Sequence, residues 1–393
     1  MDVNSFPVGE RWFAGKGRRI VAVAISERIE ISGGELAFAD VEYERGGGER
    51  YLLLDRLDWS ALLRTLADGP VAGALGRLEL RGSPPLDGLE GQRTPATDQT
   101  NTLVALADRL LVKAYRRLEP GPHPEIELLT RLRGRGAPVP AALGSIHHVA
   151  DDGSVTALAL LEEFVPGAED GWEAPIERVA SHLRGEGPAP IEEFGEAGRT
   201  AARLHDALAD EGRGRFGPAD AAAVRDSATA NLRRAADAEP ELVCSRELLS
   251  RLEGLRRLEG TSKQHTHGDL HYAQFLRAPG RPPVVIDFEG DPTRPLAERV
   301  SVDSPLRDLA CLIRSIDHIG SAASRRVGIE PDSWIADARA AALTAYGPVD
   351  HVLLHALELA EEVRELVYAQ TTLPEWLYAP RHGLRRLLGE KPA

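Results

Sequence analysis

Two short blocks near the middle of the chain carry residue types that could transfer a phosphoryl group. The first runs His267-Gly268-Asp269-Leu270-His271-Tyr272-Ala273-Gln274, so that an amide follows a carboxylate by five positions. The second, Val284-Val285-Ile286-Asp287, ends an apolar run with a carboxylate. Kinase-type phosphoryl transfer needs one carboxylate beside the attacking hydroxyl, and an amide and a second carboxylate that hold Mg²⁺ on the phosphates. Together the blocks predict a small-molecule kinase.

Each residue of this set receives a role. We expect Asp269 to orient the substrate hydroxyl and to accept its proton, and Gln274 and Asp287 to be the Mg²⁺ ligands. Each could also be an ordinary polar loop residue, but the spacing and the strand end together favour the catalytic interpretation. His205 has apolar neighbours on a predicted helix, which favours a core or capping role. Three residues are expected to support the catalytic loop: His267, Gly268 and Asp308.

A single lysine marks a predicted strand upstream of these blocks. Lys113 lies in Leu110-Leu111-Val112-Lys113-Ala114-Tyr115, and a strand lysine can grip the α- and β-phosphates while it pairs with a helix carboxylate. The following predicted helix offers Glu125 and Glu127, and we expect Glu127 because Glu125 falls in the first turn, which frays. The alternative is a solvated lysine on an edge strand.

Two further segments could contact a nucleotide. No glycine-rich motif precedes Lys113, but short hydroxyls and backbone N–H groups in a tight loop can also cradle phosphates. We therefore expect this contact from Gln99, Thr100, Asn101 and Thr102. The hinge that would meet the adenine is predicted at Glu163, Phe164 and Val165.

The patterning along the chain predicts an α+β protein with a bilobal, kinase-like arrangement. Residues 20–54 read as strands, and residues 110–115 and 155–161 as further strands. After residue 166, apolar residues recur at helical spacing over the following segments: 191–208, 241–257, 306–319, 333–345 and 352–369. We expect three domains: a β-rich cap at 1–88, an ATP-binding lobe at 89–166, and a helical lobe with the catalytic and acceptor sites at 167–393.

Composition excludes several classes of partner. The chain has 393 residues and a formal net charge of −14, which argues against nucleic acid and anionic membranes as main partners. No apolar run reaches the length of a membrane span, and the N-terminus lacks the regions of a signal peptide. The only cysteines, Cys244 and Cys311, suggest no disulfide framework, so we expect a reduced, cytoplasmic protein.

The motifs described above resemble those of the aminoglycoside phosphotransferase superfamily. The chain is similar to its maltokinase-like branch, and most similar to actinobacterial glucosamine kinases, across nearly its whole length. The similarity rests on the two blocks, on Ser304-Pro305-Leu306-Arg307-Asp308, and on Arg11-Trp12-Phe13-Ala14-Gly15 and Gln99-Thr100-Asn101-Thr102. The resemblance implies an N-terminal cap domain, ATP and Mg²⁺ as cofactors, and a small-molecule sugar as phosphate acceptor. A monomer or homodimer is the expected state.

The acceptor is assigned less directly. The tail Gln370-Thr371-Thr372-Leu373-Pro374-Glu375-Trp376 looks closer to the glucosamine kinases than to the maltokinases. A protonated amine calls for carboxylates near the transfer site, so glucosamine is the expected substrate. Maltose, an aminoglycoside, and a nucleotide-binding pseudokinase without turnover are the alternatives. The expected sugar contacts are Glu289, Asp303, Arg307, Asp317, Gln370 and Trp376, and Asp291 is a further acidic candidate.

Overall fold

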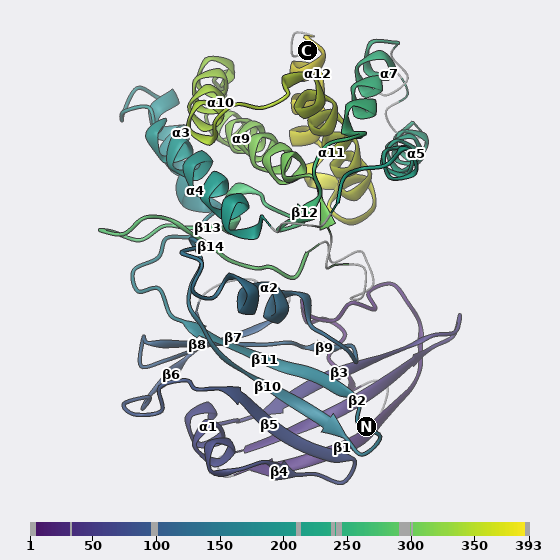
Figure 1. The fold of residues 1–393 in the computed structure, drawn as a ribbon, viewed down its shortest axis with the longest axis vertical. Helices are drawn as coiled ribbons and strands as arrows, with labels where there is room; N and C mark the ends of the chain where they lie inside the picture. The colour runs from purple at the N-terminus through teal and green to yellow at the C-terminus, as the bar shows by residue number, and fades with distance from the viewer. Residues whose placement is uncertain are drawn as a thin grey trace. The chain divides into compact units, whose positions relative to one another are not determined.

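The computed structural model describes residues 5–31, 34–95, 101–209, 214–236, 240, 246–290, 299 and 302–389. Two units are distinguished by their internal contacts, and each is described by itself. The first comprises residues 1–133 and 140–167, and the second contains 134–139 and most of the chain after 167. In the part described, strands gather in the first unit and helices mostly in the second (Figure 1), which confirms the α+β prediction.

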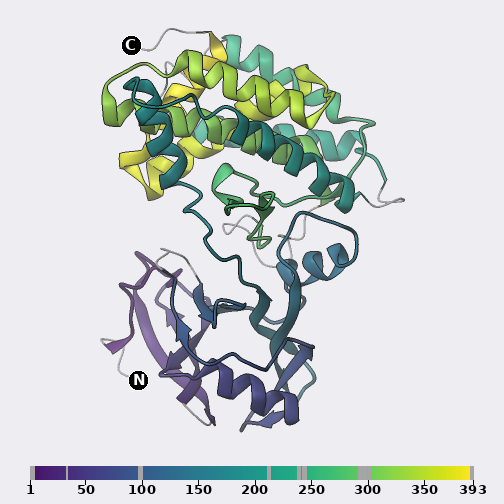
Figure 2. The ribbon, with the colours of Figure 1, turned by 90° about the vertical axis from the view of Figure 1, so that its left-hand side faces the viewer.

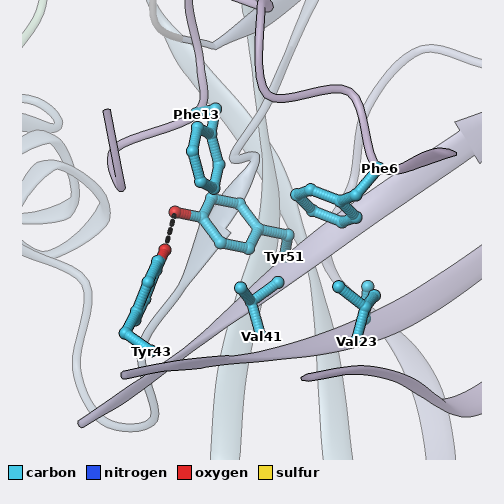
Figure 3. Close-up of a cluster of buried hydrophobic side chains, with 7 residues drawn as sticks. Phe6, Phe13, Val23, Val41, Tyr43 and Tyr51 are labelled. Atoms are coloured by element: carbon cyan, nitrogen blue, oxygen red, sulfur yellow. Dashed lines mark hydrogen bonds between the residues drawn. The ribbon is translucent and has the colours of Figure 1, made fainter. Parts of the chain in front are cut away.

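The first sheet of unit one is antiparallel and has the order β1-β2-β3-β9. Its strands are β1 (Ile20–Ile31), β2 (Gly34–Tyr43), β3 (Gly48–Asp55) and β9 (Arg117–Leu118). The N-terminal segment covers one face of this sheet, where Phe6 and Phe13 pack on Tyr51 (Figure 3). Apolar burial thus fixes a segment that has no regular secondary structure of its own.

The second sheet of unit one carries Lys113 and has the order β4-β5-β10-β11-β8-β7-β6. Its strands are β4 (Val71–Ala72), β5 (Gly76–Gly82), β6 (Gln92–Arg93), β7 (Thr102–Leu106), β8 (Leu110–Ala114), β10 (Ala142–Ala150) and β11 (Val155–Glu163). Because β4 and β5 precede residue 88, the sheet runs across the predicted boundary between cap and ATP-binding lobe. That boundary stays a prediction.

The two sheets of unit one form two layers (Figure 2). His148 of β10 lies between them, with Nε2 3.1 Å from a carboxylate oxygen of Glu27 and its ring against Phe38. Helix α1 (Trp59–Asp68) begins at Asp58, which accepts a hydrogen bond from the Ala61 N–H. Helix α2 (Pro124–Leu132) covers the other face of the second sheet, next to β10.

Unit two is built around one long buried helix, α9 (Pro305–Val327). Residues Asp308 to Ala323 of this helix are all buried, because α3, α10, α11 and α12 pack around it. The other helices among the described residues of this unit are α3 (Glu173–Leu183), α4 (Glu192–Leu208), α5 (Pro218–Ala235), α7 (Arg246–Leu252), α10 (Asp332–Tyr346), α11 (His351–Thr372) and α12 (Tyr378–Leu388), with 3₁₀ turns η2 (Glu253–Leu258) and η4 (Pro374–Trp376). Among the described residues, no helix is both long and apolar enough to span a bilayer.

Short strands and one 3₁₀ turn interrupt this helical unit where the two sequence blocks lie. β12 (Gln264–His265) pairs with β15 (Val302–Asp303), and β13 (Phe275–Leu276) pairs with β14 (Val284–Val285). The turn η3 (Tyr272–Gln274) lies between β12 and β13. These elements bring the two blocks together within one unit.

Candidate active site

The first turn of α9 anchors the catalytic loop. Ser304 caps this helix by accepting a hydrogen bond from the Leu306 N–H, and Pro305 occupies its first position. Asp308 then accepts hydrogen bonds from the backbone N–H groups of His267, at 2.7 Å, and Gly268, at 2.9 Å. Gly268 has φ +87°, a conformation that favours glycine. The predicted supporting role of Asp308 is therefore the arrangement found.

His205 of α4 completes the support of Asp308. Its Nε2–H donates to the Asp308 carboxylate at 3.1 Å, while its Nδ1 accepts from the Tyr346 hydroxyl at 2.8 Å. Burial opposes ionisation of Asp308, but the hydrogen bonds that it accepts from His205 and from the Gly268 N–H outweigh this effect and lower the pKa of this carboxyl. Asp308 thus stays an anion that accepts hydrogen bonds from the loop.

His267 fixes the position of Asp269. Its Nε2–H donates to the Ile286 carbonyl at 2.9 Å, so its Nδ1 is free to accept the Asp269 N–H at 3.3 Å. The ring also packs on Phe288, with 4.6 Å between centroids. The Asp269 carboxylate is 28% exposed and its Oδ2 lies 3.8 Å from Nε2 of His271. A carboxylate held by its backbone and open to solvent can meet a substrate hydroxyl.

Gln274 and Asp287 lie side by side at the end of the β13–β14 ladder. The Ile286 N–H donates to the Gln274 carbonyl at 3.0 Å, and Nε2 of Gln274 lies 3.4 Å from Oδ2 of Asp287. Asp287 has φ +68°, a left-handed conformation that is uncommon for a residue with a side chain and that clusters at functional sites. Rotation of the Gln274 side-chain amide by half a turn would place its oxygen where its nitrogen now lies. The pair then offers two hard oxygen ligands, which suit Mg²⁺.

In the first unit, Lys113 is paired with Glu125, so the expectation of Glu127 is wrong. Nζ of Lys113 lies 3.0 Å from Oε1 of Glu125, and the Tyr115 hydroxyl donates to Oε2 at 2.8 Å. Glu125 is only 1% exposed, because the first turn of α2 is packed on the sheet and does not fray. Glu127 instead lines a cavity of about 540 Å³ beside β5 and β10.

The other predicted nucleotide contacts are only partly described. Gln99 and Thr100 lie outside the residues that the structure describes, whereas Asn101 and Thr102 lie at the start of β7. At the predicted hinge, Glu163 ends β11, the Phe164 N–H donates to the Arg109 carbonyl, and Val165 is buried. Their role as adenine contacts stays a prediction.

Among the predicted sugar contacts, Asp303 and Arg307 form an ion pair. Nη1 of Arg307 lies 2.9 Å from Asp303, and its Nε donates to Glu361 at 2.9 Å. Trp376 stands in an aromatic cluster with Trp172 and Tyr378, at centroid distances of 5.3 and 5.2 Å. Gln370 lies near the Ala235 carbonyl, and Glu289 is partly exposed and stands two positions after Asp287. The further acidic candidate, Asp291, lies outside the described residues.

The structure does not support Asp317 as a sugar contact. Its side chain is fully buried and lies 3.3 Å from Nη1 of Arg339 and 2.5 Å from Nη2 of Arg386. A carboxylate with two guanidinium partners and no exposed surface has a structural role.

Ser315 is a site residue that sequence reasoning missed. Its hydroxyl accepts the Tyr272 N–H at 2.8 Å and so fixes the turn between Asp269 and Gln274. A serine inside a helical pattern gives no signal of such a contact.

The fold and this site define a phosphotransferase. The chain belongs to the phosphotransferase enzyme family, whose pattern matches residues 92–353. A glucosamine kinase of Mycolicibacterium smegmatis is 33% identical over 326 residues, covering 76% of this chain and 80% of that protein. A glucosamine kinase of Streptacidiphilus jiangxiensis is 33% identical over 328 residues, covering 77% and 74%. A solved glucosamine kinase in complex with glucosamine, ADP and inorganic phosphate aligns with TM-score 0.71 and 26% identity, covering 96% of each chain.

Proposed function

We propose that this protein is an ATP-dependent glucosamine kinase that transfers the γ-phosphoryl group of Mg·ATP to the 6-hydroxyl of glucosamine. The observation that carries the kinase assignment is the adjacent Gln274–Asp287 pair on the same rigid loop system as Asp269. The choice of glucosamine follows from the two glucosamine kinases that are 33% identical to this chain over three quarters of its length.

In this proposal each residue has one task. Asp269 orients the acceptor hydroxyl and receives its proton, which suits a transfer that depends mainly on positioning. Gln274 and Asp287 would hold Mg²⁺, which neutralises charge on the phosphates when it is bound. Lys113, held by Glu125, contacts the α- and β-phosphates. Asp308 acts through the loop as a positioning residue.

The acceptor site is assigned to the helical unit. Trp376 with its aromatic neighbours offers a face on which a sugar ring can stack, and Glu289 and Asp303 are the acidic candidates for the ammonium group. Gln370 and Arg307 are proposed as further hydroxyl contacts. A charge-assisted hydrogen bond to an ammonium group contributes about 1.5–3 kcal/mol, enough for about tenfold discrimination.

The remaining predictions follow from this assignment. A kinase that consumes ATP is proposed to work in the cytoplasm, as a monomer or homodimer. The division into a cap at 1–88, an ATP-binding lobe at 89–166 and a helical lobe at 167–393 is proposed as the functional division of the chain.

One assay tests the function. ADP release is followed with glucosamine, N-acetylglucosamine, glucose, maltose and an aminoglycoside, each at several concentrations. We expect the highest kcat/KM for glucosamine, about tenfold or more above glucose, and poor turnover of the acetylated sugar because it lacks the charge. A tenfold preference for maltose would overturn the glucosamine assignment. Failure of every acceptor to accelerate ADP release would overturn the kinase assignment.

A further inference from the structure

Arg116 is a buried arginine without a carboxylate partner. Its side chain is only 9% exposed, and its guanidinium lies over the Trp12 ring, 4.5 Å from the centroid. Across the described ranges, no carboxylate lies within 4.0 Å of it, and its Nε has no hydrogen-bond partner. Burial lowers the pKa of Arg116 to about 10, and the negative charge of Glu10 opposes this effect.

Other enclosed arginines of the chain differ in this respect. Arg314 lies 2.9 Å from Glu365, and Arg339 lies 2.6 Å from Glu358. A buried cation is costly unless it is paired. A guanidinium that a fold keeps enclosed and unpaired is therefore a candidate for binding an anion from outside the chain.

Arg116 borders a cavity of about 460 Å³ in the first unit. The N-terminal segment contributes Glu10, Arg11 and Trp12 to its wall, and the opposite wall includes Asn101 and Thr102. Among the described residues of this lining, two guanidinium groups stand against one carboxylate, which gives them together a net positive charge. A hydroxyl and a side-chain amide supply neutral hydrogen-bond donors.

The wall formed by the N-terminal segment is rigid. Phe6 and Phe13 are buried against Tyr51 (Figure 3), and Trp12 lies on the same ring at 5.6 Å between centroids. The backbone of Arg116 is also fixed, since its carbonyl accepts the Leu52 N–H at 2.8 Å. Trp12 and the backbone of Arg116 are therefore held in place before any ligand arrives, which reduces the entropy lost on binding.

We propose that this cavity binds an oxyanion of the phosphate type, with Arg116 as its charged contact and Thr102 and Asn101 as neutral donors. The planar guanidinium matches two phosphate oxygens. Two sources share this chemistry: free inorganic phosphate, or a phosphate group of a nucleotide. The second source rests on the proposed function, because Asn101, which lines the cavity, belongs to the predicted phosphate-binding loop, and Thr94, which also lines it, precedes that loop in sequence. The first source does not.

The test uses the full chain and direct binding. Calorimetric titrations with sodium phosphate and with ADP, at matched ionic strength set by sodium chloride, are performed on the wild type, Arg116→Met and Arg117→Gln. Arg117 is the matched control, an adjacent arginine that is one third exposed and lies 3.6 Å from Glu49. We expect Arg116→Met to weaken phosphate binding at least tenfold, and Arg117→Gln to change it less than twofold. Thr102→Val, on the opposite wall, should weaken it several-fold.

The outcomes separate the sources and the alternatives. Loss of phosphate affinity in Arg116→Met supports a site for free phosphate. If phosphate binding is absent, or is the same in both proteins, and Arg116→Met binds ADP at least tenfold more weakly, the oxyanion is a phosphate group of the nucleotide. Equal affinities of wild type and Arg116→Met for both ligands would overturn the proposal. Thermal unfolding without ligand adds a check, because Met removes an unpaired buried cation and should not lower Tm. If Arg116→Met does not fold, Thr102→Val decides alone, and wild-type affinities in that variant overturn the proposal.

Discussion

Lys113 and Glu125 form a buried ion pair in which Nζ lies 3.0 Å from Oε1, with side-chain exposures of 6% and 2%. Removing one partner of such a pair leaves an uncompensated charge and costs about 3–5 kcal/mol of stability. The ion pair also fixes the position from which Lys113 can contact the nucleotide phosphates. Glu125 is therefore a testable part of the nucleotide site.

Glu125→Gln is expected to raise KM for ATP and to lower kcat, because Lys113 loses the charge that positions it. We expect kcat/KM for ATP to fall about tenfold or more, and the urea concentration at which half of the protein is unfolded to decrease. Steady-state kinetics at varied ATP measure the first effect. Glu127→Gln is the matched control and should stay within twofold of the wild type. An effect of Glu127→Gln on ATP kinetics that exceeded that of Glu125→Gln would restore Glu127 as the partner.

Asp269→Asn is expected to lose most turnover while it keeps Mg·ATP binding, because an amide cannot accept the hydroxyl proton. Removal of such a group typically costs about 10²–10⁴-fold in rate. Rapid-quench measurement of the chemical step and ATP titration by fluorescence separate the two properties. Turnover of Asp269→Asn within fivefold of the wild type would remove Asp269 from the catalytic role.

The helices with clear apolar periodicity could be predicted from the sequence. Segments 191–208, 333–345 and 352–369 correspond closely to α4, α10 and α11. Strand β10 was not predicted, because Gly144, Ser145 and two histidines interrupt the apolar pattern that would mark it. Helix α5 was not predicted either, since its residues are mainly alanine and polar and give little periodicity. Local patterns therefore indicate an element only where apolar residues recur at a regular spacing.

The candidate site was predictable where it is local in sequence. Asp269, Gln274 and Asp287 lie within 19 residues, so spacing alone could relate them. The choice between Glu125 and Glu127 depends on how α2 packs on the sheet, which sequence spacing does not contain. The ion pairs of Asp317 depend on residues 22 and 69 positions away. Long-range packing explains both why Glu125 pairs with Lys113 and why Asp317 is buried between two arginines.

The histidine His147 gives a pH-dependent prediction. Burial lowers the pKa of His147 to about 4, and the positive field of Arg81 adds to this effect. The unfolded chain therefore binds more protons between about pH 4 and 6.5, so stability is fully present above pH 6.5 and falls as the pH is lowered. From pH 7.5 to 5.5 this one group should remove about 1 kcal/mol.

Urea unfolding of the wild type and His147→Gln at pH 7.5 and 5.5 measures this contribution. The variant cannot take up a proton there, so its loss of stability on acidification should be smaller by about 1 kcal/mol. His351→Gln replaces an exposed histidine and is the control. Identical pH dependence of wild type and His147→Gln would show that His147 is not held in its neutral form.

Asp317→Asn is expected to lower stability and to leave the acceptor kinetics nearly unchanged. Arg339 and Arg386, which are partly buried, would each lose the fully buried carboxylate of Asp317 as a partner, at a cost of about 3 kcal/mol. Thermal unfolding and KM for glucosamine are measured on the same preparation at a temperature where the variant is folded. A tenfold rise in KM with an unchanged Tm would return Asp317 to the sugar site.

Asp308 and His205 supply the last prediction, which concerns positioning. Asp308 accepts the N–H groups of His267 and Gly268, and His205 donates to the same carboxylate. Asp308→Asn should lower kcat by about 10–100-fold, because an amide oxygen alone cannot replace the two carboxylate oxygens that hold the loop. KM for ATP should change little, because none of the hydrogen bonds of Asp308 involves a residue that is proposed to contact the ATP phosphates. His205→Gln should have a smaller effect of the same kind.

The split between kcat and KM distinguishes positioning from general instability. Asp332→Asn, at the exposed first turn of α10, is the matched control and should leave both constants at wild-type values. Urea unfolding of each variant shows the fraction folded under assay conditions, to which the rates are normalised. After this correction a positioning role still predicts a low kcat for Asp308→Asn and an intermediate kcat for His205→Gln. If normalisation restores both rates to wild type, Asp308 stabilises the fold without orienting Asp269.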